Sequence, residues 1–332
     1  MKLTITRLRR GTNYKKPLRD IMDSFYELYK EYISKNPQHK YGVCNFGWST
    51  SNRKKIDDII DSDVIIIPSE NEFLEHIKGY RDKVQRERSE ILIKQIIKYL
   101  PNKHVILFRS DRADNEELYR KRTFKNKPIG KFSILDETDI SIGLHGMKYH
   151  FIKENISTQL SKTKKTYDFI YWGCDKKKLI DDVDSGDERH LIFKEIKDDT
   201  KIKSYFIGKY HHFKADRKID TMYNLLGDLT KGKSTLCFNW LDKKATTSRY
   251  HEAMALNIFP FVWKDYDIDN TLVSNQWQRV ESVSELYEKL PQIDKRFIDV
   301  KKHYLKIMKP KSWFYSMFEK RLNEILRSKK KN

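Results

Sequence analysis

Arg249 and Glu252 are the two residues whose types and spacing in this sequence are best suited to hold a ligand. They lie in residues 246–263, where a helical segment leads into the apolar run at 259–263. An i,i+3 pair near the start of a helix places both head groups beside free backbone N–H groups and the positive end of the helix dipole. In that position Arg can bind phosphate oxygens and Glu can accept hydrogen bonds from ribose hydroxyls. The alternative is a surface ion pair that stabilises a helix end.

The apolar run that follows favours the ligand-binding interpretation, because ligands of open α/β sheets bind at the carboxyl ends of the strands. Side chains that serve a ligand are expected to be open to it. Replacing Arg249 or Glu252 with Ala should therefore weaken ligand binding and largely spare folding.

A second candidate phosphate site follows the predicted strand at residues 167–174, which contains Gly173 near its end. Cations come next along the chain: Lys176, with Lys177 as its neighbour, and then Arg189 before a predicted helix from about residue 191. A strand, a glycine turn and a helix can hold a phosphate on backbone N–H groups, and the cations would neutralise a diphosphate.

A carboxylate, Asp111, follows the predicted strand at residues 104–108. At the carboxyl end of a central strand it is well placed for acid–base chemistry, although it could equally cap the next turn, and Asp114 is a local rival. A basic stretch with two aromatic residues comes after it. Its cations could contact a phosphate backbone or form a solvated charge run. The candidates for that contact are Arg112, Arg120, Lys121, Arg122 and Lys125.

Composition limits the class of protein. The chain has 332 residues, with 67 Lys and Arg against 47 Asp and Glu, a net charge of +20 that favours a polyanionic partner. An aromatic content of 13% argues against disorder. The odd number of widely spaced cysteines, Cys44, Cys174 and Cys237, is typical of neither a disulfide framework nor a zinc site and fits the cytoplasm. No apolar run approaches the roughly 20 residues of a membrane helix.

Strands and helices alternate along the whole chain, which is the pattern of an α/β fold. We expect a first domain at residues 1–160 and a second at residues 161–308. A polar linker falls at 155–166, and residues 309–332 form a C-terminal helix. The sequence Asp267-Ile-Asp269 is interpreted as turn or capping material rather than a metal motif, and Ser282 to Glu285 as a helix-capping box.

Two segments, residues 164–173 and 248–263, resemble the DNA β-glucosyltransferase family of T-even phages. The resemblance implies a GT-B fold, in which two Rossmann-like domains face a central cleft and the C-terminal helix crosses back to the first domain. It implies that the first domain, residues 1–160, binds the acceptor and that the second, residues 161–308, binds the nucleotide-sugar donor. It also implies that Arg249 and Glu252 bind the diphosphate and ribose of UDP-glucose. Gly173, Arg189 and Lys176 would contact the same donor, although Trp172 stands where the family has a glycine.

The resemblance further implies that Asp111 is the general base, after a one-residue shift in the alignment. The expected function is inverting transfer of a sugar, with UDP-glucose as the expected donor, to a 5-hydroxymethylated pyrimidine in double-stranded DNA. Mg²⁺ or Mn²⁺ could assist without a protein metal site, and a monomer is expected. The alternatives are a GT-B enzyme with a saccharide, lipid or protein acceptor, and a non-catalytic nucleic-acid-binding protein.

A positioned general base contributes roughly 10²–10⁴-fold to rate, because the acceptor hydroxyl is a poor nucleophile until its proton is removed. Asp111→Asn should therefore slow single-turnover transfer to hydroxymethylated DNA by about that factor and leave UDP and DNA binding nearly unchanged. A loss below about tenfold, or a full loss in Asp114→Asn instead, would assign the base to another residue.

Overall fold

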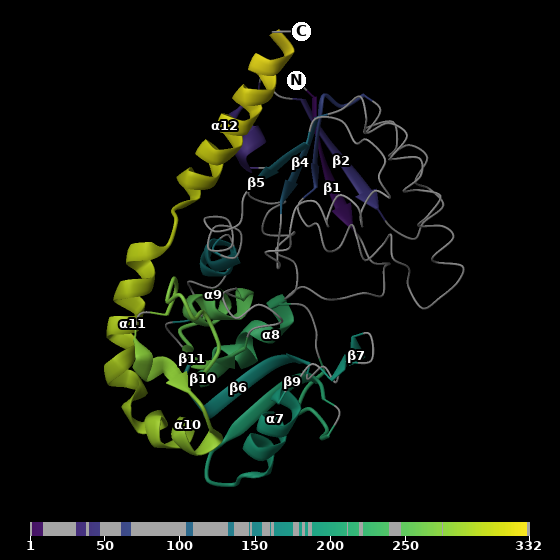
Figure 1. The fold of residues 1–332 in the computed structure, drawn as a ribbon. Coiled ribbons are helices and arrows are strands. Elements are labelled where there is room, and N and C mark those ends of the chain that lie inside the picture. The colour runs from purple at the N-terminus through teal and green to yellow at the C-terminus, as the bar shows by residue number, and fades with distance from the viewer. Residues whose placement is uncertain are drawn as a thin grey trace, which may run out of the picture. The chain divides into compact units, whose positions relative to one another are not determined.

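The computed structural model of the protein describes residues 2–8, 31–37, 40–46, 61–67, 104–108, 132–135, 146, 148–154, 160, 163–174, 179–180, 183–184, 188–210, 212–218, 222–238, 247–273 and 275–330 (Figure 1). The chain divides into two compact units. Residues 309–332 join most of the residues before 148 in the first unit, and residues 148–308 form most of the second.

The first unit is built on a five-stranded parallel sheet with the strand order β2-β1-β3-β4-β5. Val64 and Ile65 of β3 are fully buried, and β3 pairs with a strand on each side, which explains its uninterrupted run of β-branched residues. The expected strand at residues 140–144 lies outside the described residues. The strands are β1 (Lys2–Leu8), β2 (Lys40–Phe46), β3 (Val64–Ile67), β4 (His104–Phe108) and β5 (Phe132–Leu135).

The last helix, α12 (Lys311–Lys330), belongs to the first unit and contacts the short helix at residues 31–35. The ammonium of Lys311 lies 3.2 Å from the Glu31 carboxylate, and the rings of Tyr32 and Tyr315 are 5.7 Å apart. A hydrogen bond from Lys35, together with Lys311, lowers the pKa of Glu31 to about 2. These contacts hold the end of the chain against the unit in which the chain begins.

The second unit has its own five-stranded parallel sheet, with the order β12-β11-β10-β6-β9. A two-stranded antiparallel hairpin, β7 (Leu179–Ile180) and β8 (Val183–Asp184), lies in the sequence between β6 and the helix at Arg189–Asp198. The sheet strands are β6 (Tyr167–Cys174), β9 (Ser204–Lys209), β10 (Gly232–Cys237), β11 (Phe259–Trp263) and β12 (Arg279–Val280).

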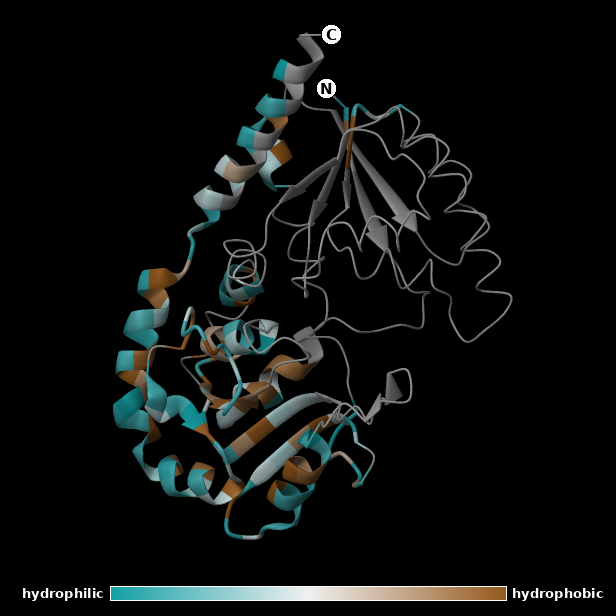
Figure 2. Ribbon diagram, in the orientation of Figure 1, coloured by the Kyte–Doolittle hydropathy of each residue, from teal (hydrophilic) through white to brown (hydrophobic). Residues whose placement is uncertain are grey.

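Helices cover both faces of this second sheet. Helix α7 (Arg189–Asp198) packs Phe193 against Tyr171 and Phe206, while α8 (Met222–Leu229) and α9 (Ser248–Ala255) lie on the other side (Figure 1). The hydrophobic residues gather on the strands and on the helix sides that face them (Figure 2). Helices α10 (Val283–Lys289) and α11 (Ile293–Ile307) complete the unit, together with the 3₁₀ turns Gln276–Gln278 and Leu290–Gln292.

Two capping features expected from the sequence are confirmed. The hydroxyl of Ser282 accepts a hydrogen bond from the backbone N–H of Glu285 at 3.1 Å, which starts α10. The Asp267 carboxylate accepts from the backbone N–H groups of Thr271, Leu272 and Val273, so this residue organises a turn. Its hydrogen-bonding capacity is therefore used within the loop after β11.

The division into units falls earlier than the boundary expected at residues 155–166. The helical residues 148–154 belong to the second unit. Lys148 forms a salt bridge with Glu252, and the ring of Tyr149 lies 5.2 Å from that of Tyr304. A polar, aperiodic stretch suggested the linker, but these long-range contacts decide which unit the preceding helix joins.

Gly173 and Gly208 sit opposite each other at the carboxyl ends of β6 and β9. Both have positive φ angles, +142° and +145°, and a Cβ on Gly208 would lie 1.7 Å from the carbonyl oxygen of Gly173. Gly208 fits against β6 at this position only because it has no side chain.

Gly208→Ala should destabilise the second unit by more than about 1–3 kcal/mol, the usual cost of one strained backbone position, because the new methyl group also overlaps a carbonyl oxygen. The matched control is Gly227→Ala in α8, where a Cβ meets nothing within 4 Å. That change should stabilise the helix by about 0.5–1 kcal/mol. Chemical denaturation of both variants checks this; equal stability of the two would contradict it.

Candidate functional site

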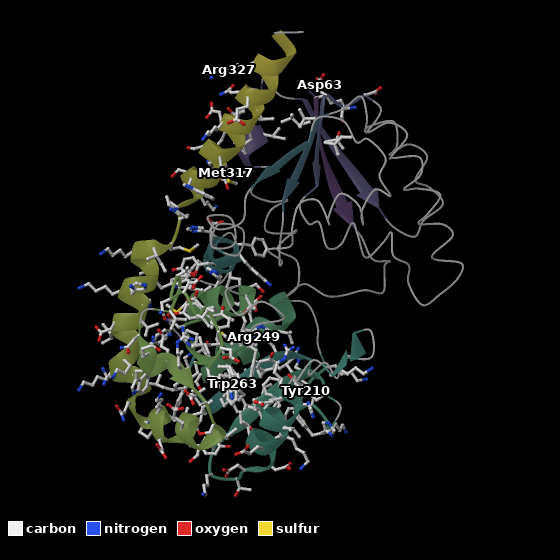
Figure 3. The ribbon with its side chains drawn as sticks, viewed as in Figure 1. Asp63, Tyr210, Arg249, Trp263, Met317 and Arg327 are labelled. Atoms are coloured by element: carbon white, nitrogen blue, oxygen red, sulfur yellow. The ribbon has the colours of Figure 1, made fainter. Side chains whose placement is uncertain are left out.

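The candidate site lies where the second sheet reverses its strand order. From β6 the chain moves to β9 on one side of β6 and then returns to β10 on the other side. The helix that follows β6 and the helix that follows β10 lie on opposite faces of the sheet (Figure 1). Open α/β sheets bind their ligands at such a switch point. Helix α9 follows β10 and begins at this edge, so its first turn places Arg249 beside the end of β6 (Figure 3).

Arg249 is held by aromatic rings rather than by an acid. The centre of its guanidinium group lies 4.1 Å from the ring centroid of Tyr171 and 4.6 Å from that of Trp172. Its Nη1 atom is buried and has no hydrogen-bond partner in the described part of the chain. An unpaired buried donor costs about 1–3 kcal/mol, and a guanidinium group matches the oxygens of phosphate in its bidentate geometry. The arrangement favours an anionic ligand.

Gly173 packs closely against Arg249. A Cβ on Gly173 would lie 3.1 Å from the Nη2 atom of Arg249, so a side chain at this position would crowd the guanidinium group. Thr247, the N-cap residue of α9, makes no side-chain capping hydrogen bond. The positive end of the helix dipole therefore adds to the charge of Arg249.

Glu252 lies one turn further along α9 and is only 3% exposed. Its Oε1 atom accepts from the ammonium of Lys148 and, at 3.1 Å, from the hydroxyl of Ser248. Its Oε2 atom accepts from the indole N–H of Trp172 at 2.7 Å. Burial favours the neutral acid, but Lys148, Arg249 and these hydrogen bonds outweigh it and lower the pKa of Glu252.

The sequence led us to expect that substitution of Glu252 would largely spare folding. The contacts in the structure predict instead that it destabilises the fold. Lys148 is 2% exposed, and its ammonium would lose its carboxylate partner if Glu252 were truncated. Breaking a buried ion pair on one side costs about 3–5 kcal/mol. Arg249 forms no such pair among the described residues, so its substitution is still expected to spare folding largely.

Arg189 stands at the start of α7, on the same edge of the sheet. Its guanidinium carbon lies 5.9 Å from the ring centroid of Phe238, the residue that follows β10. Cys237, the last residue of β10, is fully buried, and burial raises the pKa of its thiol, so it remains a neutral core residue. Arg189 lies beside the residue that follows β10, the strand that leads to α9.

The remaining sequence candidates lie outside the described residues. This holds for the candidate base Asp111 and its rival Asp114, and for Lys176 and Lys177. It also holds for the basic positions Arg112, Arg120, Lys121, Arg122 and Lys125.

Sequence reasoning missed two of the residues that complete the site. Lys148 comes from a segment about a hundred residues before its partner, and no local pattern marks it. Trp172 was recognisable only as a bulky residue before a glycine, because nothing in the sequence shows that its N–H reaches Glu252. Both contacts join segments that only the folded sheet brings together.

No family model and no curated protein sequence matches the chain. Solved structures do match it over almost its whole length. A crystal structure of the DNA-modifying enzyme β-glucosyltransferase has a TM-score of 0.60 and 14% identity, covering 97% of this chain and 100% of that one. A mutant of the T4 phage β-glucosyltransferase in complex with UDP-glucose has a TM-score of 0.57 and 16% identity, covering 96% and 99%.

An α-glucosyltransferase in complex with UDP and a 13-mer DNA containing an HMU base has a TM-score of 0.57 and 10% identity, covering 98% of this chain and 99% of that one. The chain shares the fold of these glucosyltransferases. The fold class expected from the resemblance is confirmed to that extent, as an α/β chain with parallel sheets whose structural neighbours are GT-B enzymes. Within the described residues, no helix is long and apolar enough to span a bilayer.

Because the pKa of Glu252 is lowered by folding, its ion pair contributes stability above the unfolded-state pKa and loses it as pH falls through the folded-state value. Glu252→Gln should lower the unfolding free energy at pH 7 by about 3–5 kcal/mol, with a smaller further loss on acidification than in the wild type.

Urea unfolding from pH 7 to pH 3 measures both effects. The matched control is Glu285→Gln, which breaks the half-exposed pair with Lys289 and should cost at most about 1 kcal/mol. Equal losses of unfolding free energy in the two variants would show that the buried ion pair of Glu252 stabilises the fold no more than the partly exposed pair of Glu285 does.

Proposed function

We propose that the protein is a nucleotide-sugar-dependent glycosyltransferase that modifies DNA. The observation that carries this is the buried Nη1 atom of Arg249 beside Gly173, at the switch point of the second sheet; this atom has no hydrogen-bond partner among the described residues. A diphosphate supplies the oxygens that this donor lacks. The shared fold supports the choice of donor, because its solved examples include complexes with UDP-glucose.

In this proposal the second unit binds the donor. Arg249 and the start of α9 hold the diphosphate, with Gly173 allowing close approach and Arg189 and Lys176 adding positive charge. Glu252 accepts from the ribose. The donor is UDP-glucose, which the structural neighbours bind according to their descriptions.

The first unit binds the acceptor, as in other GT-B enzymes. The net charge of +20 favours a polyanion, and neighbours with this fold have been solved with DNA. The acceptor is a 5-hydroxymethylated pyrimidine in double-stranded DNA. The basic residues Arg112, Arg120, Lys121, Arg122 and Lys125 contact its backbone.

The reaction is a direct displacement with inversion. The hydroxymethyl oxygen attacks the anomeric carbon, the bond from that carbon to the β-phosphate oxygen breaks, and the hydroxyl proton passes to Asp111. Arg249 stabilises the charge that builds up on the departing UDP.

A neighbour with this fold has been solved with UDP and Mn²⁺. Among the described residues, no three His, Cys, Asp or Glu side chains are grouped so as to bind a metal ion. The described residues thus do not provide a protein metal site, and no step of the proposed reaction is assigned to a metal.

Transfer of labelled glucose from UDP-glucose tests the proposal, with hydroxymethylated and unmodified DNA as acceptors. Label should enter only the modified DNA. Transfer to neither DNA, with UDP still bound, would favour a saccharide, lipid or protein acceptor; absence of UDP binding would favour a non-catalytic nucleic-acid-binding protein.

Arg249→Ala should weaken UDP binding by about 1.5–3 kcal/mol, roughly 10- to 150-fold, because it removes charged hydrogen bonds to phosphate. The matched control is Arg296→Ala in α11, another arginine stacked over an indole, 5.5 Å from the Trp277 ring centroid. It should bind UDP normally. Calorimetry measures both, and normal affinity in a folded Arg249→Ala would refute the phosphate site.

A further inference from the structure

The carboxylate of Glu252 is nearly saturated with hydrogen bonds before any ligand arrives. Its Oε1 accepts from Lys148 and Ser248, and its Oε2 accepts from Trp172. A carboxylate offers about four lone-pair sites, two on each oxygen. The described residues therefore occupy three of them, and the remaining one is on Oε2.

Two of the three donors cannot easily give way to a ligand. Lys148 and Trp172 are 2% and 1% exposed, so a ligand that displaced either would leave a buried donor without its acceptor. Such a group retains the full penalty of its lost hydration. Ser248 is the more exposed donor, but its hydroxyl shares Oε1 with the ammonium of Lys148.

We propose that Trp172 and Lys148 are positioning residues that restrict Glu252 to a single hydroxyl of the donor's ribose. This inference rests on the proposed function, since it assumes that a nucleoside diphosphate binds at Arg249. The indole N–H of Trp172 sets the restriction because it takes one of the two lone pairs on Oε2. The indole ring has a separate task, since its face supports the guanidinium group of Arg249.

These two tasks can be separated by one substitution. Trp172→Phe keeps an aromatic ring beneath Arg249 and removes the N–H that reaches Glu252, together with part of the volume of the indole. Oε2 then has two open lone pairs, and the second ribose hydroxyl gains an acceptor.

The experiment compares the affinity of UDP with those of 2′-deoxy-UDP and 3′-deoxy-UDP by calorimetry on the full chain. In the wild type, one of the two deoxy analogues should bind about tenfold or more weakly than UDP, and the other within about threefold. In Trp172→Phe both analogues should bind about tenfold or more weakly than UDP. A residue that merely stabilised the fold would change all three affinities together.

The matched control is Trp277→Phe, the same chemical change at a tryptophan packed against Phe259 at the amino end of β11. It should keep the wild-type pattern. If both analogues bind the wild type about tenfold more weakly, or if Trp172→Phe keeps discrimination against one analogue only, the restriction is refuted. If UDP itself does not bind the wild type, the proposed function fails instead.

Discussion

The buried carboxylate of Glu252 is the group on which the site depends. It draws together three separate parts of the chain: the start of the second unit through Lys148, the end of β6 through Trp172, and α9 itself. A buried charge is tolerated only when its partners satisfy it, so these three parts must keep their relative positions. The carboxylate thereby fixes where α9 begins relative to β6.

The two candidate donor-binding residues differ because of this carboxylate. Arg249 and Glu252 are one helical turn apart, yet three described donors already bind Glu252 while a donor of Arg249 has no partner among the described residues. Aromatic faces support Arg249 without using its N–H groups. We infer that the protein orients the cation and leaves its hydrogen bonds to the ligand.

Strand order explains why the site lies at this place. The strand order reverses at β6, which makes the carboxyl ends of β6 and β10 a switch point of the kind at which open α/β sheets bind ligands. The solved structures that share the fold are only 10–17% identical to this chain. The shared fold is therefore kept while most of the side chains differ.

Much of the fold could be predicted from the sequence because the signals are local. Parallel strands in the centre of a sheet are buried on both faces, so they appear as short apolar runs such as residues 64–67 and 259–263. Arg249, Gly173 and Arg189 could likewise be recognised as phosphate-binding candidates, because helix starts and glycine turns have their own patterns. Those predictions needed no knowledge of distant contacts.

The sequence by itself determined the α/β class, most of the described strands, and the position of the Arg249 and Glu252 pair on one helix. Only the tertiary structure decided that the helix at residues 148–154 joins the second unit, that Glu252 is held by Lys148 and Trp172, and that the Nη1 atom of Arg249 has no hydrogen-bond partner among the described residues. The reason is that helix and strand patterns depend on neighbours a few residues away. Whether a side chain is available to a ligand depends instead on donors and acceptors that folding brings from distant segments.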